Sequence, residues 1–368
     1  MIIPHRTIRI LTAIWLFSLY DAVAAAEPLD TWHVRSVPVQ SSYLTAIAYG
    51  NGTFVAVGYS GKILTSQDGT VWSERASGTY SILRGVAYGN NLFLAVGDYA
   101  TVLTSADGAT WRRSSSGTTL WDINFVQGAF MGVGADGAML ASADGSAWRS
   151  ITSGTSEWLN RAAGGGNTSV AVGDWGVVLT STDQSAWRSS YPGPPDMSLF
   201  SITYGKSTFA AVGEAGTILT SADGNAWSTR LSGTIQSLWD ITYGNNTFVA
   251  VGDAGTILTS ADGAVWRSRT SGASQALNGI IFGGSTFVAV GSAGMILQSE
   301  PISTDPVCKK GDVNGDGTIG LADAILALQV MTGPTPVPGA ISCADVNADQ
   351  RIGLPEAIYI LQKSAGLR

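Results

Sequence analysis

Two acidic stretches near the C-terminus carry the residues best suited to metal chemistry. In each stretch, carboxylate or amide oxygens stand at alternate positions, and a further carboxylate closes the stretch. Calcium, a hard cation, takes about six to eight oxygen ligands, and this spacing supplies them. The expected ligands are Asp312, Asn314, Asp316, Thr318 through its carbonyl, and Asp323 in the first loop, and Asp345, Asn347, Asp349, Arg351 through its carbonyl, and Glu356 in the second.

A helix is expected to follow each loop, over residues 321–331 and 354–362, because apolar residues recur there at helical spacing. Four side chains are expected to pack the two helices together: Ile325, Leu328, Ile358 and Leu361. The repeat predicts a small α-helical module of duplicated EF-hand-like design over residues 311–368, with two Ca²⁺ sites. Gln350 stands where the first loop has a turn glycine, which predicts weaker binding in the second loop. The alternative is a pair of acidic turns without metal.

This duplicated loop–helix unit, over about residues 308–368, resembles a type I dockerin. The resemblance implies a calcium-folded module that docks onto a cohesin domain and attaches polysaccharide-degrading proteins to a scaffold or cell surface. The positions that contact cohesin in that family hold Leu321-Ala322 and Leu354-Pro355, where clostridial dockerins often have Ser-Thr. An unfamiliar cohesin-like partner and an intramolecular contact therefore both remain open.

The middle of the chain holds a second group of residues that could do chemistry, namely aromatic side chains beside charged ones. An aromatic ring offers an apolar face to a sugar, and carboxylates accept hydrogen bonds from its hydroxyls. The alternative is structural, with carboxylates that favour turns and rings that fill gaps between sheets. The candidate ligand-binding residues are Arg84, Trp121, Asp122, Arg161, Trp175, Phe200, Trp239 and Asp240.

Catalysis has weaker support in the sequence. A glycosidase needs two carboxyl groups about 5–10 Å apart, and Asp122 and Asp240 are weak candidates because they fall three repeat units apart. The histidines are His5 and His33, so a Ser-His-Asp triad has no suitable base. The interpretation leans towards a protein that is not an enzyme.

These residues are positioned by a repeat of about 39 residues, the size of one propeller blade. Within each unit, apolar residues alternate in runs separated by turn signals, which is typical of a four-stranded antiparallel meander. A Val-Gly pair marks each unit, at Val57, Val96, Val133, Val172, Val212, Val251 and Val290. A leucine precedes each pair at a constant distance, at Leu44, Leu83, Leu120, Leu159, Leu199, Leu238 and Leu277.

The recurring tryptophans indicate how the array closes. Trp32 precedes the first unit, whereas the last unit, 277–299, has no tryptophan after it. An open array would leave unpaired sheet edges, so residues 31–36 are expected to supply the outer strand of the last blade. The fold class predicted for residues 27–300 is therefore an all-β, seven-bladed propeller closed by an N-terminal strand.

A Ser-x-Asp-Gly-x-x-Trp motif joins the third and fourth strands of most units. It occurs at 66–72, 105–111, 142–148, 221–227 and 260–266, and at 181–187 with Gln184 in place of glycine. The motif resembles the Asp-box, or BNR-like, repeat of sialidases, sortilins and photosystem II assembly-factor propellers, with one residue fewer before the tryptophan. We expect the Asp to accept backbone N–H bonds, the Gly to take a positive φ, and the Trp to fill the gap between sheets. The Arg-Ile-Pro motif of sialidases is absent.

Composition limits the remaining functions. A net charge of −7 and a charged fraction of 13% give no electrostatic support for nucleic-acid binding. Residues 1–26 match a secretory signal peptide, with an apolar run at 10–20 and small residues at 24–26, and no membrane span is expected after its cleavage. The expected location is extracellular, cell-surface or periplasmic. Cys308 and Cys343 each stand just before one of the two acidic loops, Cys308 within the linker 301–310. In such an oxidising compartment they favour a disulfide over free thiols.

Together these features predict a secreted, non-catalytic binding or scaffold protein. Its propeller face would bind a glycan or a surface protein, and its calcium-dependent tail would attach to a cohesin-like partner in polysaccharide utilisation. The alternative is a glycoside hydrolase of the Asp-box propeller kind, which would hydrolyse O-glycosyl bonds. A third hypothesis, an assembly chaperone, rests on the blades alone.

Overall fold

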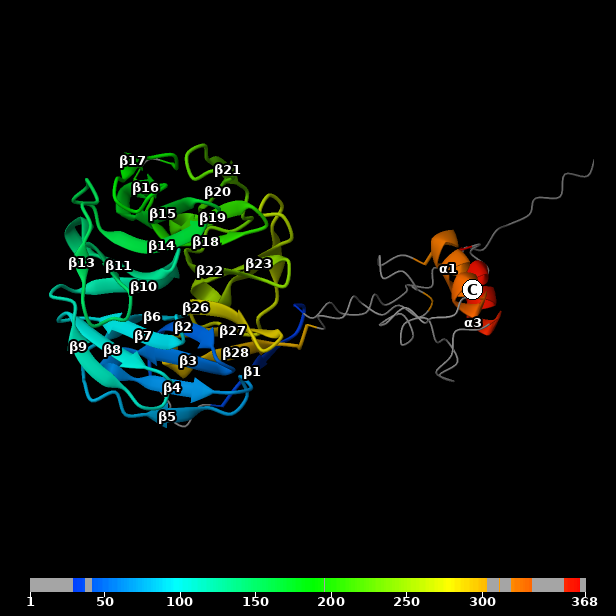
Figure 1. The fold of residues 1–368 in the computed structure, drawn as a ribbon, viewed down its shortest axis with the longest axis horizontal. Coiled ribbons are helices and arrows are strands. Elements are labelled where there is room, and N and C mark those ends of the chain that lie inside the picture. Colours follow the sequence, from blue (N-terminus) through cyan, green and yellow to red (C-terminus); the bar gives the residue numbers. More distant parts are fainter. Residues whose placement is uncertain are drawn as a thin grey trace, which may run out of the picture.

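Seven four-stranded antiparallel sheets surround a central axis in the computed structural model (Figure 1). The structure describes residues 29–36, 42–194, 196–302, 311, 319–332 and 354–364. The seven-bladed propeller expected from the repeat is confirmed. The signal peptide, the disulfide between Cys308 and Cys343, and most of the linker 301–310 lie outside the described residues and remain predictions.

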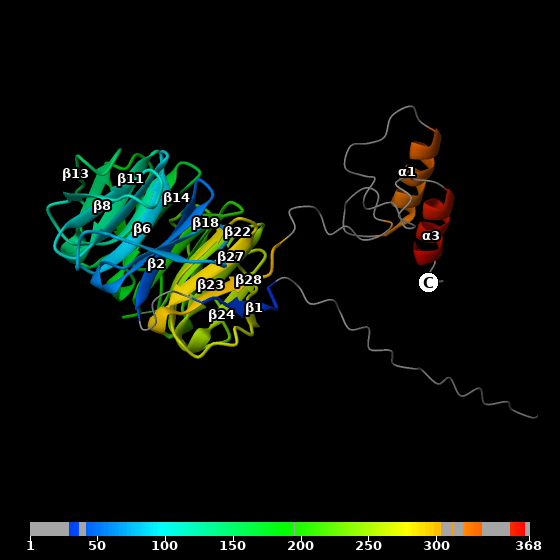
Figure 2. The same ribbon diagram turned by 90° about the horizontal axis from the view of Figure 1, so that it is seen from below.

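Each blade contributes one strand to each of four concentric positions, and Figure 2 shows the ring turned by 90°. The innermost strands are β2 (Leu44–Gly50), β6 (Leu83–Gly89), β10 (Leu120–Val126), β14 (Leu159–Gly165), β18 (Leu199–Gly205), β22 (Leu238–Gly244) and β26 (Leu277–Gly283). The second strands are β3 (Thr53–Gly58), β7 (Leu92–Gly97), β11 (Ala129–Gly134), β15 (Thr168–Gly173), β19 (Thr208–Gly213), β23 (Thr247–Gly252) and β27 (Thr286–Gly291).

The third strands are β4 (Ile63–Ser66), β8 (Thr101–Ser105), β12 (Met139–Ser142), β16 (Val178–Ser181), β20 (Ile218–Ser221), β24 (Ile257–Ser260) and β28 (Ile296–Ser299). The outer strands are β5 (Ser73–Arg75), β9 (Arg112–Ser115), β13 (Arg149–Ser150), β17 (Arg188–Ser190), β21 (Ser228–Arg230), β25 (Arg267–Arg269) and β1 (Trp32–Val34). Blade 1 runs from β2 to β5, and the blades are numbered from there in chain order.

Strand β1 closes the ring by completing blade 7, as the sequence predicts. It pairs with β28 in antiparallel register, with Trp32 opposite Ser299 and Val34 opposite Leu297. Trp32 is buried and donates from Nε1 to the carbonyl of Leu29 at 3.0 Å. The pairing gives the edge of β28 a partner, so the ring is continuous.

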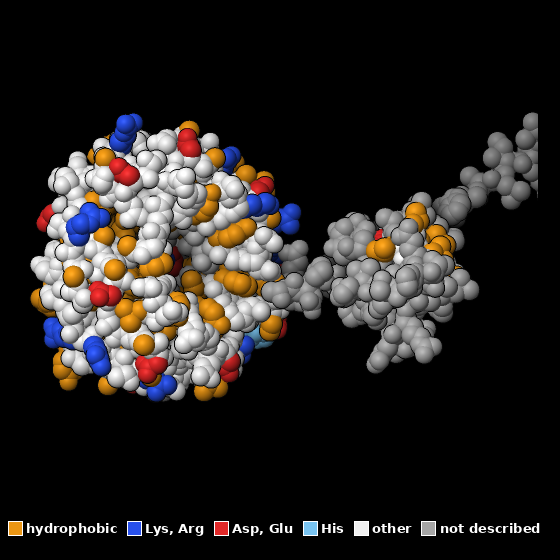
Figure 3. Space-filling view, in the orientation of Figure 1, with side chains coloured by type: hydrophobic (Ala, Val, Ile, Leu, Met, Phe, Trp, Pro, Cys, Tyr) orange, Lys and Arg blue, Asp and Glu red, His pale blue; other side chains and the backbone are white. Residues whose placement is uncertain are grey.

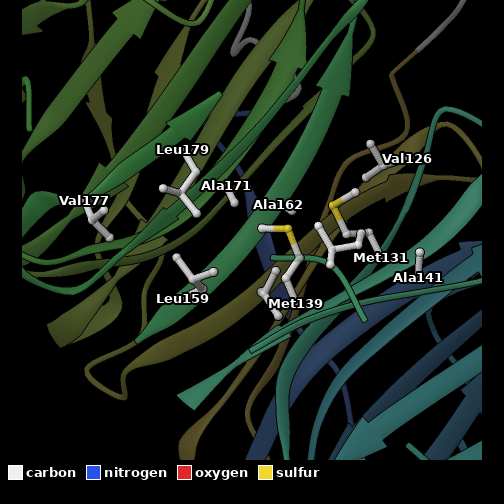
Figure 4. Close-up of a cluster of buried hydrophobic side chains, with 11 residues drawn as sticks. Val126, Met131, Met139, Ala141, Leu159, Ala162, Ala171, Val177 and Leu179 are labelled. Carbon is white, nitrogen blue, oxygen red and sulfur yellow. The ribbon is translucent and has the colours of Figure 1, made fainter. Parts of the chain in front are cut away.

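The hydrophobic core of the propeller is divided among the gaps between neighbouring sheets. Figure 4 shows one such cluster, in which Met131 and Met139 of blade 3 face Leu159 and Leu179 of blade 4. The residues that face these gaps alternate along each strand, as expected for sheets that pack face to face. Neighbouring blades therefore hold each other in place without disulfides.

The turn between the third and fourth strands has the local structure that the Ser-x-Asp-Gly-x-x-Trp motif predicts. In blade 1, Asp68 Oδ1 accepts from the backbone N–H groups of Thr70 at 2.8 Å and Val71 at 3.0 Å. Gly69 has a φ of +73°, and Trp72 Nε1 donates to its carbonyl at 2.9 Å. The same kind of backbone N–H bonds, in the blade 2 turn, lower the pKa of Asp107 to about 2.

Two blades depart from this pattern in one bond. The indole Nε1 atoms of Trp148 in blade 3 and Trp187 in blade 4 are buried and have no hydrogen-bond partner among the described residues. In blade 3 the carbonyl of Gly145 instead accepts from Ser114 Oγ at 3.1 Å. In blade 4, Gln184 replaces the glycine and takes the left-handed conformation at φ 59°.

The C-terminal part contains two helices, α1 (Leu321–Thr332) and α3 (Leu354–Ser364), at the places that the sequence predicts. They pack against each other through Ala324, Ala327, Ala357 and Ile360, all buried. The prediction that larger side chains form this contact was wrong. Ile325, Leu328, Ile358 and Leu361 are 43–49% exposed. Small alanines let two helices approach closely, which turns the neighbouring stripe of larger residues outwards.

Candidate functional site

Two sets of loops form one face of the propeller, which we call the upper face. The first set joins second to third strands, as short turns in most blades: η1 (Tyr59–Gly61), η2 (Ala135–Gly137), η3 (Asp174–Gly176), η4 (Glu214–Gly216), η5 (Asp253–Gly255) and η6 (Ser292–Gly294). The second set joins each blade to the next. Backbone hydrogen bonds tie the two sets together, from Tyr59 N to Tyr43 O at 2.9 Å and from Asp174 N to Trp158 O at 2.9 Å. Side chains from both sets are therefore presented together on this face.

A cavity of about 380 Å³, which we call the bowl, lies on the upper face. The residue after the recurring leucine contributes from every blade: Thr45, Arg84, Trp121, Asn160, Phe200, Trp239 and Asn278. Tyr43, Tyr59, Trp158 and Asp174 complete the lining. Seen face on, the ring is hollowed at its centre, with hydrophobic side chains around the hollow (Figure 3).

The structure therefore brings four of the predicted ligand-binding residues into one cavity: Arg84, Trp121, Phe200 and Trp239. Trp175 is not among the residues that line the bowl; it lies in η3 with a φ of 55° and is 59% exposed. The sequence analysis missed Tyr43 and Trp158. Each directly precedes one of the recurring leucines, so extending the register by one position would have found both.

Three aromatic pairs stand around the bowl. The ring centroids of Tyr43 and Tyr59 are 4.7 Å apart, and those of Trp121 and Trp158 are 4.8 Å apart. Phe200 and Trp239 are stacked at 4.4 Å, with 19° between their planes. Such pairs give the lining broad, rigid apolar surfaces.

The residue after the leucine also contacts the first residue of the next turn in its own blade. Arg84 donates to both carboxylate oxygens of Asp98, with Nη2 3.3 Å from Oδ2. Asn160 Nδ2 donates to Asp174 Oδ1 at 2.8 Å. Trp239 Nε1 donates to Asp253 Oδ1 at 2.7 Å. These bonds fix the orientation of three lining side chains, of which one is a cation and two are neutral.

Three lining residues also tie neighbouring blades together. Thr45 Oγ1 donates to the carbonyl of Leu83 at 2.6 Å, and Asn160 Nδ2 donates to that of Leu199 at 3.0 Å. Asn278 Nδ2 donates to the carbonyl of Leu44 at 2.8 Å. The polar lining side chains are thus largely occupied by structural bonds, whereas the aromatic ones present their surfaces to the bowl.

Below this ring, three of the candidate residues form a buried ionic cluster. Arg161 Nη1 lies 2.9 Å from Asp240 Oδ1, and Arg161 Nε lies 3.7 Å from Asp122 Oδ2. The cluster joins blades 3, 4 and 6. Its three residues occupy equivalent positions on the innermost strands β10, β14 and β22, next to the axis. Gly85 leaves room for it, because a Cβ atom there would lie 2.8 Å from Asp122 Cα.

The two carboxylates of the cluster have different surroundings. Asp240 Oδ1 also accepts from Ser201 Oγ at 2.7 Å and Ile241 N at 2.8 Å, and Oδ2 accepts from Ile280 N at 2.8 Å. Asp122 Oδ2 has no hydrogen-bond partner among the described residues. Burial raises the pKa of Asp122 to about 6, with Arg161 lowering it and Asp240 raising it further.

This geometry bears on the weak catalytic candidates. Asp122 and Asp240 converge on one arginine, although they come from blades 3 and 6. Both are buried, at 7% and 2% exposure, and Asp240 has both oxygens engaged by the protein. A glycosidase acid and base must reach the substrate. The arrangement is that of an ion-paired support beneath the bowl.

Of the residues expected to bind calcium, the described part of the chain includes one side chain, that of Asp323. Asp323 Oδ2 accepts from the N–H of Gly320 at 2.9 Å, just before α1. The side chains of the other nine predicted ligands lie outside the described residues. Within the described ranges, no group of three or more His, Cys, Asp or Glu side chains is arranged to hold a metal. No helix among the residues that the structure describes is long and apolar enough to cross a membrane.

Comparison with known proteins places the fold. No protein-family model matches the sequence, and no curated protein matches it. Among solved structures, YCF48 bound to D1 peptide is 17% identical with a TM-score of 0.61, covering 76% of this chain and 98% of that one. YCF48 from Cyanidioschyzon merolae is 17% identical with a TM-score of 0.60, covering 73% and 98%. A catalytically inactive virginiamycin B lyase from Staphylococcus aureus with quinupristin is 11% identical with a TM-score of 0.68, covering 74% and 99%. At these identities the likeness supports the propeller fold.

Proposed function

We propose that this protein is an exported, non-catalytic binding protein that captures a protein partner on the upper face of its propeller. The observation that carries the proposal is the bowl, in which three aromatic pairs surround one cavity. Concave sites with aromatic walls and few polar groups are the usual form of binding pockets. YCF48, a propeller of similar fold, has been solved bound to D1 peptide, and this precedent supports a peptide or protein ligand here.

Exposed apolar side chains extend the upper face beyond the bowl. Among the described residues of the propeller, the large exposed hydrophobic side chains outside this face are Val34, Val71 and Val265. The blade-connecting and turn loops of the upper face carry the remainder, including Tyr80, Tyr99, Trp175, Tyr191, Leu231 and Ile235. Exposed apolar side chains gathered on one face of a protein mark interaction sites. Aliphatic residues such as Leu231 and Ile235 favour a protein partner, because a sugar-binding surface relies on rings and polar groups.

A glycan is the second candidate ligand, and the stacked Phe200–Trp239 pair favours it. Trp239 is 37% exposed and held in place by Asp253, so its ring could support a sugar face. The glycoside hydrolase alternative would need Asp122 and Asp240 to act on that sugar. Their burial and their ion pairs with the same side chain, Arg161, support a structural role instead.

The C-terminal module completes the proposal as a calcium-dependent attachment device. Its two helices follow the two acidic loops, and the dockerin-like repeat of the sequence supports docking to a cohesin-like partner. The propeller would then be tethered outside the cell, at the cell surface or in the periplasm, in the service of polysaccharide utilisation.

The experiment is a parallel screen of the full chain, with calcium, against random twelve-residue peptides and a glycan array. We expect peptide ligands whose affinity falls at least tenfold in Trp239→Ala and Phe200→Ala, because both remove the stacked wall of the bowl. Val71→Ala, an exposed apolar residue in the turn between β4 and β5, is the matched control and should leave affinity unchanged.

The other outcomes are equally clear. Glycan hits that depend on Trp239, without peptide hits, would make the protein a lectin. Release of reducing sugar from such hits would make it an enzyme. Ligands that bind Trp239→Ala and Phe200→Ala as well as the unchanged chain would overturn the bowl as the binding site.

A further inference from the structure

The bowl has an uneven distribution of charge that follows from its repeat. In blades 2, 4 and 6, an aspartate at the start of the turn contacts the residue after the leucine. Asp98 meets the guanidinium of Arg84 and is neutralised by it. Asp174 and Asp253 receive their bonds from neutral groups, the amide of Asn160 and the indole of Trp239. Two of the three equivalent carboxylates therefore have no cationic partner among the described residues.

The uncompensated carboxylates lie in consecutive blades. Glu214 of blade 5 occupies the same turn position as Asp174 of blade 4 and Asp253 of blade 6, and it accepts a hydrogen bond from the N–H of Ser198 at 3.4 Å. No basic side chain among the described residues forms an ion pair with Asp174, Glu214 or Asp253. The stacked pair of Phe200 and Trp239 belongs to blades 5 and 6. Asp174 lines the bowl together with this pair, and Glu214 and Asp253 stand outside the lining, at the equivalent turn positions of the next two blades. We call the stacked pair and these three carboxylates the acidic sector.

The opposite side of the bowl shows how an aromatic wall and a carboxylate are used together. Arg84 lies between them: its guanidinium pairs with Asp98, and its Cζ atom lies 4.5 Å from the ring centroid of Trp121. Trp121 in turn contacts Trp158. On that side the protein itself supplies all three groups: the carboxylate of Asp98, the guanidinium of Arg84 and the indole of Trp121. In the acidic sector, the carboxylates and the stacked rings are present without the cation.

We infer that the acidic sector receives an arginine side chain of the protein partner, stacked on the Phe200–Trp239 pair and ion-paired with Asp174 and Glu214. This inference rests on the proposed function and specifies its partner. A guanidinium is planar, stacks on aromatic faces and binds carboxylates through a fork of N–H donors, which an ammonium does not do. The net charge of −7 also attracts a basic segment towards this protein.

The test starts from the peptides selected on the full chain as ligands that Trp239→Ala weakens. Each arginine in a selected peptide is replaced in turn by citrulline, which keeps the shape and removes the charge, and by lysine. We expect one arginine at which either replacement raises Kd at least tenfold in calorimetry. The citrulline effect should shrink when salt is raised, because the lost interaction is ionic.

Variants of the chain identify where that arginine binds. In Asp174→Asn combined with Glu214→Gln, the citrulline effect should fall below twofold, since the charges that it senses are gone. Both replacements keep a side-chain oxygen that can accept the existing hydrogen bonds. Asp136→Asn removes an exposed carboxylate of the blade 3 turn and is the matched control, expected to leave the tenfold effect in place.

Bowl-dependent peptides that lack arginine, or that tolerate citrulline or lysine without loss, would overturn this inference while the proposed function stands. A tenfold citrulline effect that persists in the double variant would place the arginine elsewhere and would also overturn it. If no peptide depends on Trp239, the proposed function itself fails. The two failures are therefore distinguishable.

Discussion

At the level of single residues, Asp122 combines burial with an incompletely satisfied charge. Its Oδ2 atom has no hydrogen-bond partner among the described residues, and the nearest charge is Arg161 Nε at 3.7 Å. Asp240, on the same arginine, receives hydrogen bonds on both oxygens. One arginine thus supports two carboxylates, and burial raises the pKa of the less satisfied one, Asp122.

The Asp122→Asn substitution should reveal this in the pH dependence of folding. The pKa of Asp122 rises from 3.8 to about 6 in the folded chain, so the native state binds a proton that the unfolded state releases. The stabilisation from this group is present below pH 4 and is lost as pH rises through about 6. At about 1.4 kcal/mol per pKa unit, the change is on the order of 2–3 kcal/mol.

The measurement is the free energy of unfolding, by urea, of both proteins between about pH 4 and pH 7. Subtracting the free energy of unfolding of Asp122→Asn from that of the wild-type chain isolates the effect of Asp122 from that of the other carboxylates. This difference should fall steadily as the pH rises across this range. Parallel curves would show that Asp122 has an ordinary pKa and that the cluster is better solvated than its burial implies.

At the level of elements, the turns between third and fourth strands differ in one bond that can be tested. Trp266 donates from Nε1 to the carbonyl of Gly263 at 2.9 Å, whereas Trp187 Nε1 is buried without a partner among the described residues. Both side chains fill the gap between two blades. They therefore form a matched pair for separating the hydrogen bond from the packing.

We expect Trp266→Phe to destabilise the propeller by about 1–2 kcal/mol more than Trp187→Phe. The first substitution leaves the buried carbonyl of Gly263 unpaired, whereas the second removes an indole N–H that was itself unpaired. Both replace an indole by a smaller ring at the same position of the repeat. Urea unfolding followed by circular dichroism measures the difference, and equal losses would mean that a water already serves Trp187.

The elements also show what the sequence could and could not predict. The leucine register explains why seven equivalent residues, from Thr45 to Asn278, line one cavity, because a repeat puts equivalent positions at equivalent places. It did not predict that Arg161 reaches Asp240 in blade 6, since contacts across the axis depend on side-chain length and on small neighbours such as Gly85. In the helices, two apolar stripes lie side by side, and spacing alone did not show that alanines would form the contact.

At the level of the whole molecule, the calcium prediction implies that the two parts of the chain have different sources of stability. Metal binding of this kind usually supplies the folding energy of a small module, whereas the propeller is held by its inter-blade cores. We expect calorimetry to detect two Ca²⁺ ions per chain, with Asp312→Ala and Asp345→Ala each removing one. A chelator should abolish the helical signal while the strand signal and the thermal transition of the propeller persist. An unchanged helical signal, with no heat of binding, would contradict the calcium-folded module.

The pairing of β1 with β28 has a mechanical consequence. Because the strands are antiparallel and Trp32 lies opposite Ser299, the chain enters and leaves the propeller at the same end of this pair. A force that pulls the start of β1 away from the end of β28 would break the hydrogen bonds between these strands one after another and would release β1 first. A pull through the tail alone reaches β28, which is flanked by both β1 and β27, so the load is shared across the blade. A load applied at the C-terminal side of the propeller must therefore break two rows of hydrogen bonds to remove β28, whereas a load on β1 must break one.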